Sequence, residues 1–140
     1  MQFIAIANTA AMSQTVFLFS VPISLITELI LHANNTRDIK SDTSVGATTL
    51  ASILGKKNSI LLYKVVLLAA YVVIVFLIRQ TGNYGLAIVF ASVPQAVSLV
   101  AKVESSDDRI FSNCDEFTAQ FHLPFGLLTV VGIAIGKMYF

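Results

Sequence analysis

Long apolar runs, each close to the length that crosses a lipid bilayer as a helix, constrain this chain more than any other feature. The four clearest runs are Val16 to Ala33, Ser59 to Ile78, Asn83 to Ala101, and Phe117 to about Gly136. About 20 helical residues cross the hydrocarbon core of a bilayer, which is about 30 Å thick. Of the 140 residues 12% are charged and 56% hydrophobic, whereas a soluble domain is about 25% charged. The sequence therefore predicts an all-α, multi-pass transmembrane helical bundle of four spans, or five if residues 1 to 11 are the stump of another.

The distribution of charge excludes one class of function and orients the spans. The net charge is +1 and the nine basic residues are scattered, so the chain lacks the basic patch of a nucleic-acid-binding protein. The connection from Asn34 to Asn58 holds four basic residues, whereas the turn from Gln80 to Gly82 has only Arg79 at its edge. Because cytoplasmic loops of membrane proteins are enriched in Lys and Arg, we expect the first connection to lie in the cytosol.

Polar residues gather where the first span ends. Asp38 and Asp42 are four residues apart, so on a continuous helix their side chains would share one face, about 5 to 6 Å apart. Such carboxylates repel unless a cation lies between them, and Mg²⁺ is commonly held by one or two carboxylates together with substrate phosphate oxygens. Arg37 and Lys40 can neutralise diphosphate charge directly. The pattern indicates a magnesium-bridged diphosphate site, and from spacing alone a solvated, salt-bridged loop is an equal alternative.

Other ionisable residues have more ordinary interpretations. Glu28 lies inside the first span, where ionisable groups are functional candidates by default. It can equally form a structural hydrogen bond with His32 at i+4, which is the interpretation we favour for these two residues. His122, at the mouth of the last span, is interpreted as an interfacial polar residue, and Asp115 as part of a solvated acidic loop that could cover a cavity mouth.

The segment that contains the two aspartates has a recognisable form. Residues 31 to 42 read LHANNTRDIKSD, and Gly46, the TLA at 49 to 51 and Leu54-Gly55 follow. This form, NNxRDxxxDxxxGxxTLAxxLG, resembles the second aspartate-rich motif of the UbiA prenyltransferase superfamily. It is most similar to the menaquinone-forming branch, which includes MenA and its animal relative. The resemblance is strong over Val16 to Gly55 and rests on hydropathy beyond that segment.

The resemblance implies both a fold and a reaction. It implies about nine spans around a cavity, with two aspartate-rich motifs facing each other on the cytosolic side. Magnesium would bridge both motifs to an isoprenyl diphosphate, whose isoprenyl group would pass to an aromatic, naphthoquinone-type acceptor in menaquinone or prenylquinone biosynthesis. Carried over by position, the metal ligands and catalytic residues would be Asp38 and Asp42, and the substrate-binding residues Asn34, Asn35, Arg37 and Lys40.

The chain departs from the family pattern in two respects. The first motif, NxxxDxxxD, is absent, because Asn8 has no aspartate downstream before Asp38. Many members also place a basic residue directly after the second aspartate and an acidic residue two positions after the first, where this chain has Thr43 and Lys40. We interpret residues 1 to 140 as one partial domain, the C-terminal half of such an enzyme with its motif at residues 34 to 42. Alone it should be inactive and need a missing N-terminal half.

Two other classes of function remain open. A non-catalytic membrane scaffold or pseudoenzyme could keep the motif and use its helices for association. Half of a transporter could bind a cation through Glu28, Asp38 and Asp42, although the TLAxxLG continuation argues against it.

Overall fold

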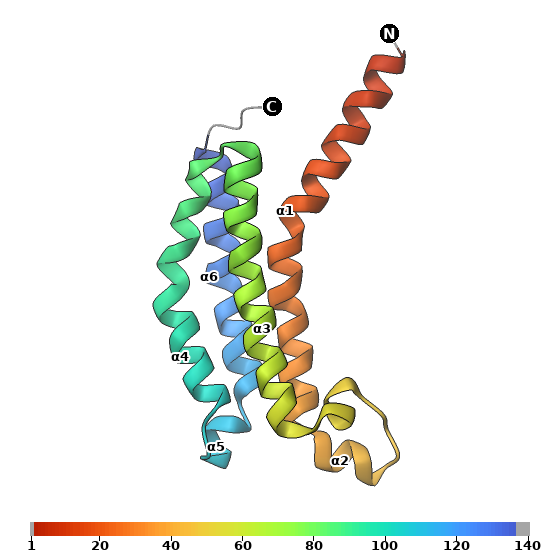
Figure 1. Cartoon of the computed structure of the whole chain (residues 1–140), viewed down its shortest axis with the longest axis vertical. Helices are drawn as coiled ribbons and strands as arrows, with labels where there is room; N and C mark the ends of the chain where they lie inside the picture. The colour runs from red at the N-terminus through yellow and green to blue at the C-terminus, as the bar shows by residue number, and fades with distance from the viewer. Residues whose placement is uncertain (1, 137–140) are drawn as a thin grey trace.

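A computed structural model describes residues 2–136 of the chain, with the side chains of Gln14 and of residues 16–136. In this part of the chain every regular element is a helix. The elements are α1 (Gln2–Arg37), α2 (Ile39–Ser44), α3 (Leu50–Thr81), η1 (Tyr84–Ser92), α4 (Val93–Val103), α5 (Asp108–Phe111) and α6 (Cys114–Ile135). Figure 1 shows the long helices side by side, with the short helices α2 and α5 together at one end of the bundle.

Four segments are long and apolar enough to cross a membrane. They are Val16–Arg37, Leu50–Thr81, Tyr84–Val103 and Cys114–Ile135. Each contains one of the four runs expected from the sequence or overlaps it almost completely, which confirms the all-α, multi-pass bundle. Residues 2–11, interpreted above as the stump of a separate span, instead form the first part of α1, which continues through Pro22 as one helix.

The second span begins earlier than its apolar run because a local signal starts the helix at Leu50. Thr49 and Ser52 form a capping box, in which each side-chain oxygen accepts a hydrogen bond from the other residue's backbone N–H, at 3.1 and 2.9 Å. Gly55 then interrupts the helical backbone with φ 72° and ψ 162°, a conformation that glycine adopts readily. Lys56 and Lys57, which we expected in a connection between spans, therefore belong to α3.

The third span changes helix type part-way. It runs as a 3₁₀ helix from Tyr84 to Ser92 and as an α-helix from Val93 to Val103. Pro94 lies in the first turn of α4, where a missing N–H removes no interior hydrogen bond. Pro94 therefore lies at the change from η1 to α4.

The bundle interior contains hydrogen bonds between helices as well as apolar contacts. The Tyr63 and Thr118 hydroxyls lie 2.9 Å apart and link α3 to α6, and those of Tyr71 and Ser92 lie 2.7 Å apart and link α3 to η1. All four residues are buried, so each hydroxyl group has a hydrogen-bond partner within the protein. These bonds fix the rotation of α3 about its own axis.

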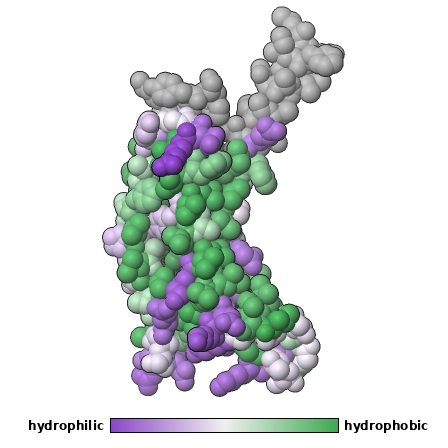
Figure 2. All heavy atoms as spheres, viewed as in Figure 1, coloured by the Kyte–Doolittle hydropathy of each residue, from purple (hydrophilic) through white to green (hydrophobic). Residues whose placement is uncertain are grey.

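The outer face of α3 is apolar and suits contact with lipid. Between residues 61 and 76 its exposed side chains are all hydrophobic: Leu61, Val65, Leu68, Val72, Val75 and Phe76. Figure 2 shows hydrophobic side chains over the middle of the face in view, with hydrophilic ones mainly toward its two ends. This arrangement is the one expected of a bundle whose middle lies in hydrocarbon.

Candidate functional site

The predicted motif lies where the first span ends and the chain turns. α1 stops at Arg37, and Asp38 precedes α2 with φ −91° and ψ 7°. The Asp38 N–H still donates to the Asn34 carbonyl at 3.0 Å, and the Asp42 N–H to the Asp38 carbonyl at 2.9 Å. The continuous helix assumed for the two aspartates is therefore interrupted at Asp38, but they remain one helical turn apart.

Arg37 is the centre of a hydrogen-bonded network at this turn. Its Nε and Nη2 atoms donate to the two carboxylate oxygens of Asp38 at 2.8 and 2.9 Å, a bidentate arrangement. Nη2 also donates to the Asn34 side-chain oxygen. Nη1 donates to Asp115 at the start of α6, at 2.7 Å. One guanidinium group thus joins the motif to the last span.

The network determines the charge state of Asp38. The side-chain hydrogen bond from Arg37 is the largest influence and lowers the pKa of Asp38 below its usual value, against a smaller opposing effect of desolvation. Asp38 therefore stays ionised at neutral pH. Because its carboxylate is held by Arg37, it makes no side-chain cap on α2, although it occupies the N-cap position.

The other predicted site residues surround this network without joining it. Asn35 and Asp42 are half-buried and Lys40 is exposed. Within residues 14 and 16–136, no hydrogen bond or ion pair uses any of these three side chains. The structure thus brings together Asn34, Arg37 and Asp38, and leaves Asn35, Lys40 and Asp42 with side-chain groups available to a ligand.

A pocket of about 340 Å³ opens beside the network, between the end of α1, the start of α3 and α5. Its basic members are Arg37, Lys40 and Lys56, and its other lining residues are Thr36, Ile39, Asp108, Phe111 and Ser112. Lys56 lies over the Phe111 ring with Nζ 3.7 Å from the centroid, a cation–π contact that holds its ammonium group at the pocket. Cationic groups from three segments therefore converge on one hollow next to the aspartates, a chemistry that suits an anion.

The donor set around the aspartates suits Mg²⁺ but is incomplete. Carboxylate oxygens of Asp38 and Asp42 and amide oxygens of Asn34 and Asn35 are the hard ligands that this ion prefers. In the part of the chain described by the structure, no group of three or more His, Cys, Asp or Glu residues could hold a metal. Further ligands from outside this group of residues would have to complete the coordination of the ion.

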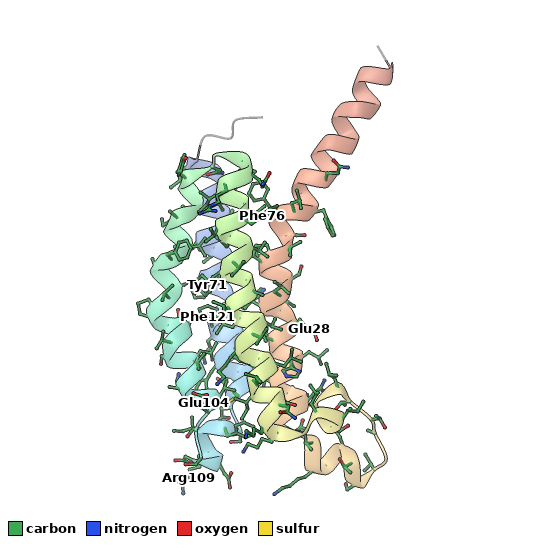
Figure 3. The ribbon with its side chains drawn as sticks, in the orientation of Figure 1. Glu28, Tyr71, Phe76, Glu104, Arg109 and Phe121 are labelled. Atoms are coloured by element: carbon green, nitrogen blue, oxygen red, sulfur yellow. The ribbon has the colours of Figure 1, made fainter. Side chains whose placement is uncertain are left out.

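Deeper in the first span, His32 has a structural role with a different partner from the one expected. Its Nε2 lies 2.9 Å from the backbone carbonyl oxygen of Ser59, and both residues are buried between α1 and α3. The expected pairing of His32 with Glu28 is therefore wrong. Glu28 is exposed, and Figure 3 places it on the side of α1 that is turned away from α3.

Two contacts of α6 were not identified from sequence. Asp115, interpreted above as part of a solvated loop, instead binds Arg37. His122 lies with Nε2 2.9 Å from the Thr27 hydroxyl oxygen on α1. Each pair joins residues far apart in sequence (78 and 95 positions), and neither residue stands in a recognisable motif.

Comparison with known proteins decides the family. The model of the UbiA prenyltransferase family matches residues 1–123, which is most of the chain. The chain belongs to the UbiA prenyltransferase family. This result agrees with the resemblance seen in the motif at residues 34 to 42 and extends it over α3, η1, α4 and the beginning of α6.

Curated UbiA relatives are longer than this chain. All three named here are called "UbiA prenyltransferase domain-containing protein 1". The Gallus gallus protein is 36% identical over 124 residues, which cover 89% of the chain and 36% of the relative. The Homo sapiens protein is 36% identical, with coverage of 84% and 33%, and the Dictyostelium discoideum protein is 32% identical, with coverage of 93% and 40%. The chain therefore spans about a third to two fifths of the length of these relatives. No solved structure matches it at a significant level.

Proposed function

We propose that this chain is the C-terminal part of a membrane prenyltransferase that moves an isoprenyl group from an isoprenyl diphosphate to an aromatic, naphthoquinone-type acceptor. The observation that supports the proposal most directly is the juxtaposition of Asp38 and Asp42 with the basic pocket of Arg37, Lys40 and Lys56. Family membership supplies the reaction class, and the NNxRD form of the motif favours the menaquinone-forming branch.

Asp38 and Asp42 would hold Mg²⁺, with Asn34 and Asn35 beside them at the diphosphate end. Bound there, the ion would offset the negative charge that the diphosphate gains as it leaves. Because the chain supplies only two carboxylates at this place, the facing ligands would come from the companion N-terminal half. The length of the curated relatives is consistent with such a half.

The basic pocket would receive the diphosphate itself. Arg37, whose donors are engaged by Asp38, Asn34 and Asp115, would contribute its positive charge, and Lys40 and Lys56 would offer point charges that are free to approach the phosphate oxygens. In the reaction, the bond between the isoprenyl carbon and the diphosphate oxygen breaks, and its electron pair leaves with the diphosphate. A bond from that carbon to the aromatic ring forms, and the attacked ring carbon loses its proton to water. Cationic groups fixed where the charge develops stabilise this step. We place the motif on the cytosolic side, where the Lys and Arg content of its connection puts it.

The test is magnesium-dependent isoprenyl transfer by the full-length protein in liposomes. We expect Asp38→Asn to lower turnover by about a hundredfold or more, because a ligand for the charge-stabilising ion is lost. Asp107→Asn is a matched control, since Asp107 caps α5 by accepting the Arg109 N–H and asparagine caps equally well. Wild-type turnover by the Asp38 variant would contradict the metal assignment.

The same experiment separates the enzyme from the scaffold. A full-length protein without NxxxDxxxD, in itself or in a partner chain, that transfers no isoprenyl group would favour the scaffold. A full-length protein that contains NxxxDxxxD and turns over with Mg²⁺ would exclude the scaffold.

A further inference from the structure

One face of α1 carries polar groups in the middle of the membrane span. Glu28 and Thr27 are exposed, and Thr27 is bonded to the half-buried His122 of α6. Figure 3 shows Glu28 pointing away from the α3 side of α1. The polar patch of Thr27, Glu28 and His122 therefore lies on the outside of the described bundle.

This patch is unsuited to lipid. An ionisable side chain at the depth of the hydrocarbon is costly and faces a protein interior or a polar cavity in nearly all membrane proteins. The outer face of α3 provides the contrast, because its exposed side chains between residues 61 and 76 are all hydrophobic. The lipid therefore covers α3, and the patch on α1 faces the inside of the complete protein.

The hydrogen bonds define what kind of ligand the patch can take. Thr27 Oγ1 lies 3.0 Å from the Ile23 carbonyl oxygen, to which it can donate its one proton, and 2.9 Å from Nε2 of His122. With the proton given to the carbonyl, Nε2–H donates to the hydroxyl and a neutral His122 presents Nδ1 as an acceptor. The Glu28 carboxylate also only accepts when ionised. Glu28 and His122, which meets α1 at the neighbouring residue Thr27, thus present acceptors at the same depth of the span. Such a pair of acceptors matches a ligand that brings donors, such as the hydroxyl groups of an aromatic ring.

The patch also lies at a suitable depth below the motif. Glu28 precedes Asp38 by ten residues, which is about 15 Å along the helix axis. That interval leaves room for a metal-bound diphosphate and an aromatic ring placed in line. It puts the patch on the membrane side of the reacting carbon, where an apolar ring partitions.

We propose that Glu28, supported by His122, determines acceptor recognition by binding the hydroxyl groups of the aromatic acceptor. The inference rests on the proposed function and deepens it, because it names the residues that select the second substrate. Thr27 is a positioning residue, since it fixes the proton of His122 on Nε2 and contacts the acceptor only through that ring.

The kinetic test uses the full-length protein in liposomes with 1,4-dihydroxynaphthalene under reducing conditions and farnesyl diphosphate as the donor. We expect Glu28→Gln to raise KM for the dihydroxynaphthalene by about tenfold to a hundredfold, the effect of a lost hydrogen bond to a charged group. KM for farnesyl diphosphate should not change, because the pocket that holds it is untouched. Glu116→Gln is the matched control, since Glu116 is exposed at the start of α6 and bonds only Gln120 among the described residues.

A binding test needs no turnover. Wild-type protein should bind 1,4-dihydroxynaphthalene at least about tenfold more tightly than 1,4-dimethoxynaphthalene, which has no hydroxyl protons, and Glu28→Gln should remove that preference. If Glu28→Gln does not accumulate in membranes, Glu28→Asp keeps the charge, shortens the side chain and should raise the same KM selectively.

The outcomes separate the two proposals. Isoprenyl transfer with an unchanged acceptor KM in Glu28→Gln would overturn the inference and leave the proposed function intact. A Glu28-dependent preference for the diol in a protein that transfers no isoprenyl group with Mg²⁺ would support the inference and contradict the proposed function. Equal binding of the diol and its dimethyl ether by wild-type protein would also overturn the inference.

Discussion

The close approach of η1 and α6 makes Gly132 intolerant of even one added methyl group. A Cβ atom built on Gly132 would lie 2.9 Å from both the Gly85 carbonyl oxygen and the Leu86 Cα, and 3.2 Å from the Gly85 carbonyl carbon. All of these are backbone atoms, so no side chain can rotate away and the two helices must separate. Forcing such an extra group into packed surroundings costs about 1 to 3 kcal/mol.

Gly126 on the same helix provides a matched control. A Cβ atom there would meet nothing within 4 Å, so Gly126→Ala adds no clash. Both substitutions gain the same intrinsic helix preference of alanine over glycine, about 0.5 to 1 kcal/mol. This contribution cancels when the two variants are compared, and Gly132→Ala should be less stable than Gly126→Ala by the clash alone, about 1 to 3 kcal/mol.

The assay is reversible unfolding of the full-length protein in bicelles, with the free energy of unfolding compared between the variants. Magnesium dependence should be the same in both, because Gly132 is 17 residues from Asp115, about 25 Å along α6. Equal stability of the two variants would show that η1 and α6 do not meet at Gly85 and Gly132, and would refute the arrangement described here.

Two further predictions concern the Arg37 network. The Arg37 and Asp115 side chains are 29% and 26% exposed, so a double-mutant cycle with Arg37→Gln and Asp115→Asn should give a coupling of at most about 1 kcal/mol, smaller in high salt. A coupling of several kcal/mol would mean that the pair is desolvated. Because the pKa of Asp38 is lowered, its ionised form contributes stability above its unfolded pKa of about 3.9, and this contribution is lost as the pH falls through the lower folded value. The unfolding free energies of wild-type protein and Asp38→Asn should therefore converge below about pH 4, and a constant gap would contradict the assignment.

The spans could be predicted from sequence because hydropathy and length are local properties. The predicted ends of the spans were less accurate, for reasons that the structure shows. α3 begins at Leu50 rather than Ser59, because the Thr49 capping box starts a helix within a segment whose charge suggested a connection. The 3₁₀ geometry of Tyr84–Ser92, a segment that packs closely against α6, is not indicated by any local pattern in its sequence.

The position of the site could also be predicted, whereas its internal contacts could not. The motif around Asp38 is a local string with a fixed spacing, and the structure keeps that spacing across the bend. The partner of Arg37 is Asp115, 78 residues away, and a single sequence gives no indication of which acidic residue a guanidinium will meet. We expected Glu28 to bond His32 because i+4 neighbours on a helix can interact. The His32 ring instead contacts the Ser59 carbonyl of α3.

The last span shows how one helix face can position residues along the whole depth of the site. One set of α6 residues, spaced alternately by three and four positions, consists of Asp115, Thr118, His122, Phe125, Thr129 and Gly132. At this spacing they form a single stripe along α6. Near the motif the stripe contacts Arg37 through an ion pair, at mid-depth it contacts Thr27 through a hydrogen bond, and at the far end it contacts Gly85 through backbone packing. Polar contacts with α1 therefore occur at the two depths where we place diphosphate and acceptor, and the tightest packing occurs where neither substrate is expected. A change at Gly132 should consequently act on stability, whereas changes at Asp115 and His122 should act on the two ends of the substrate site.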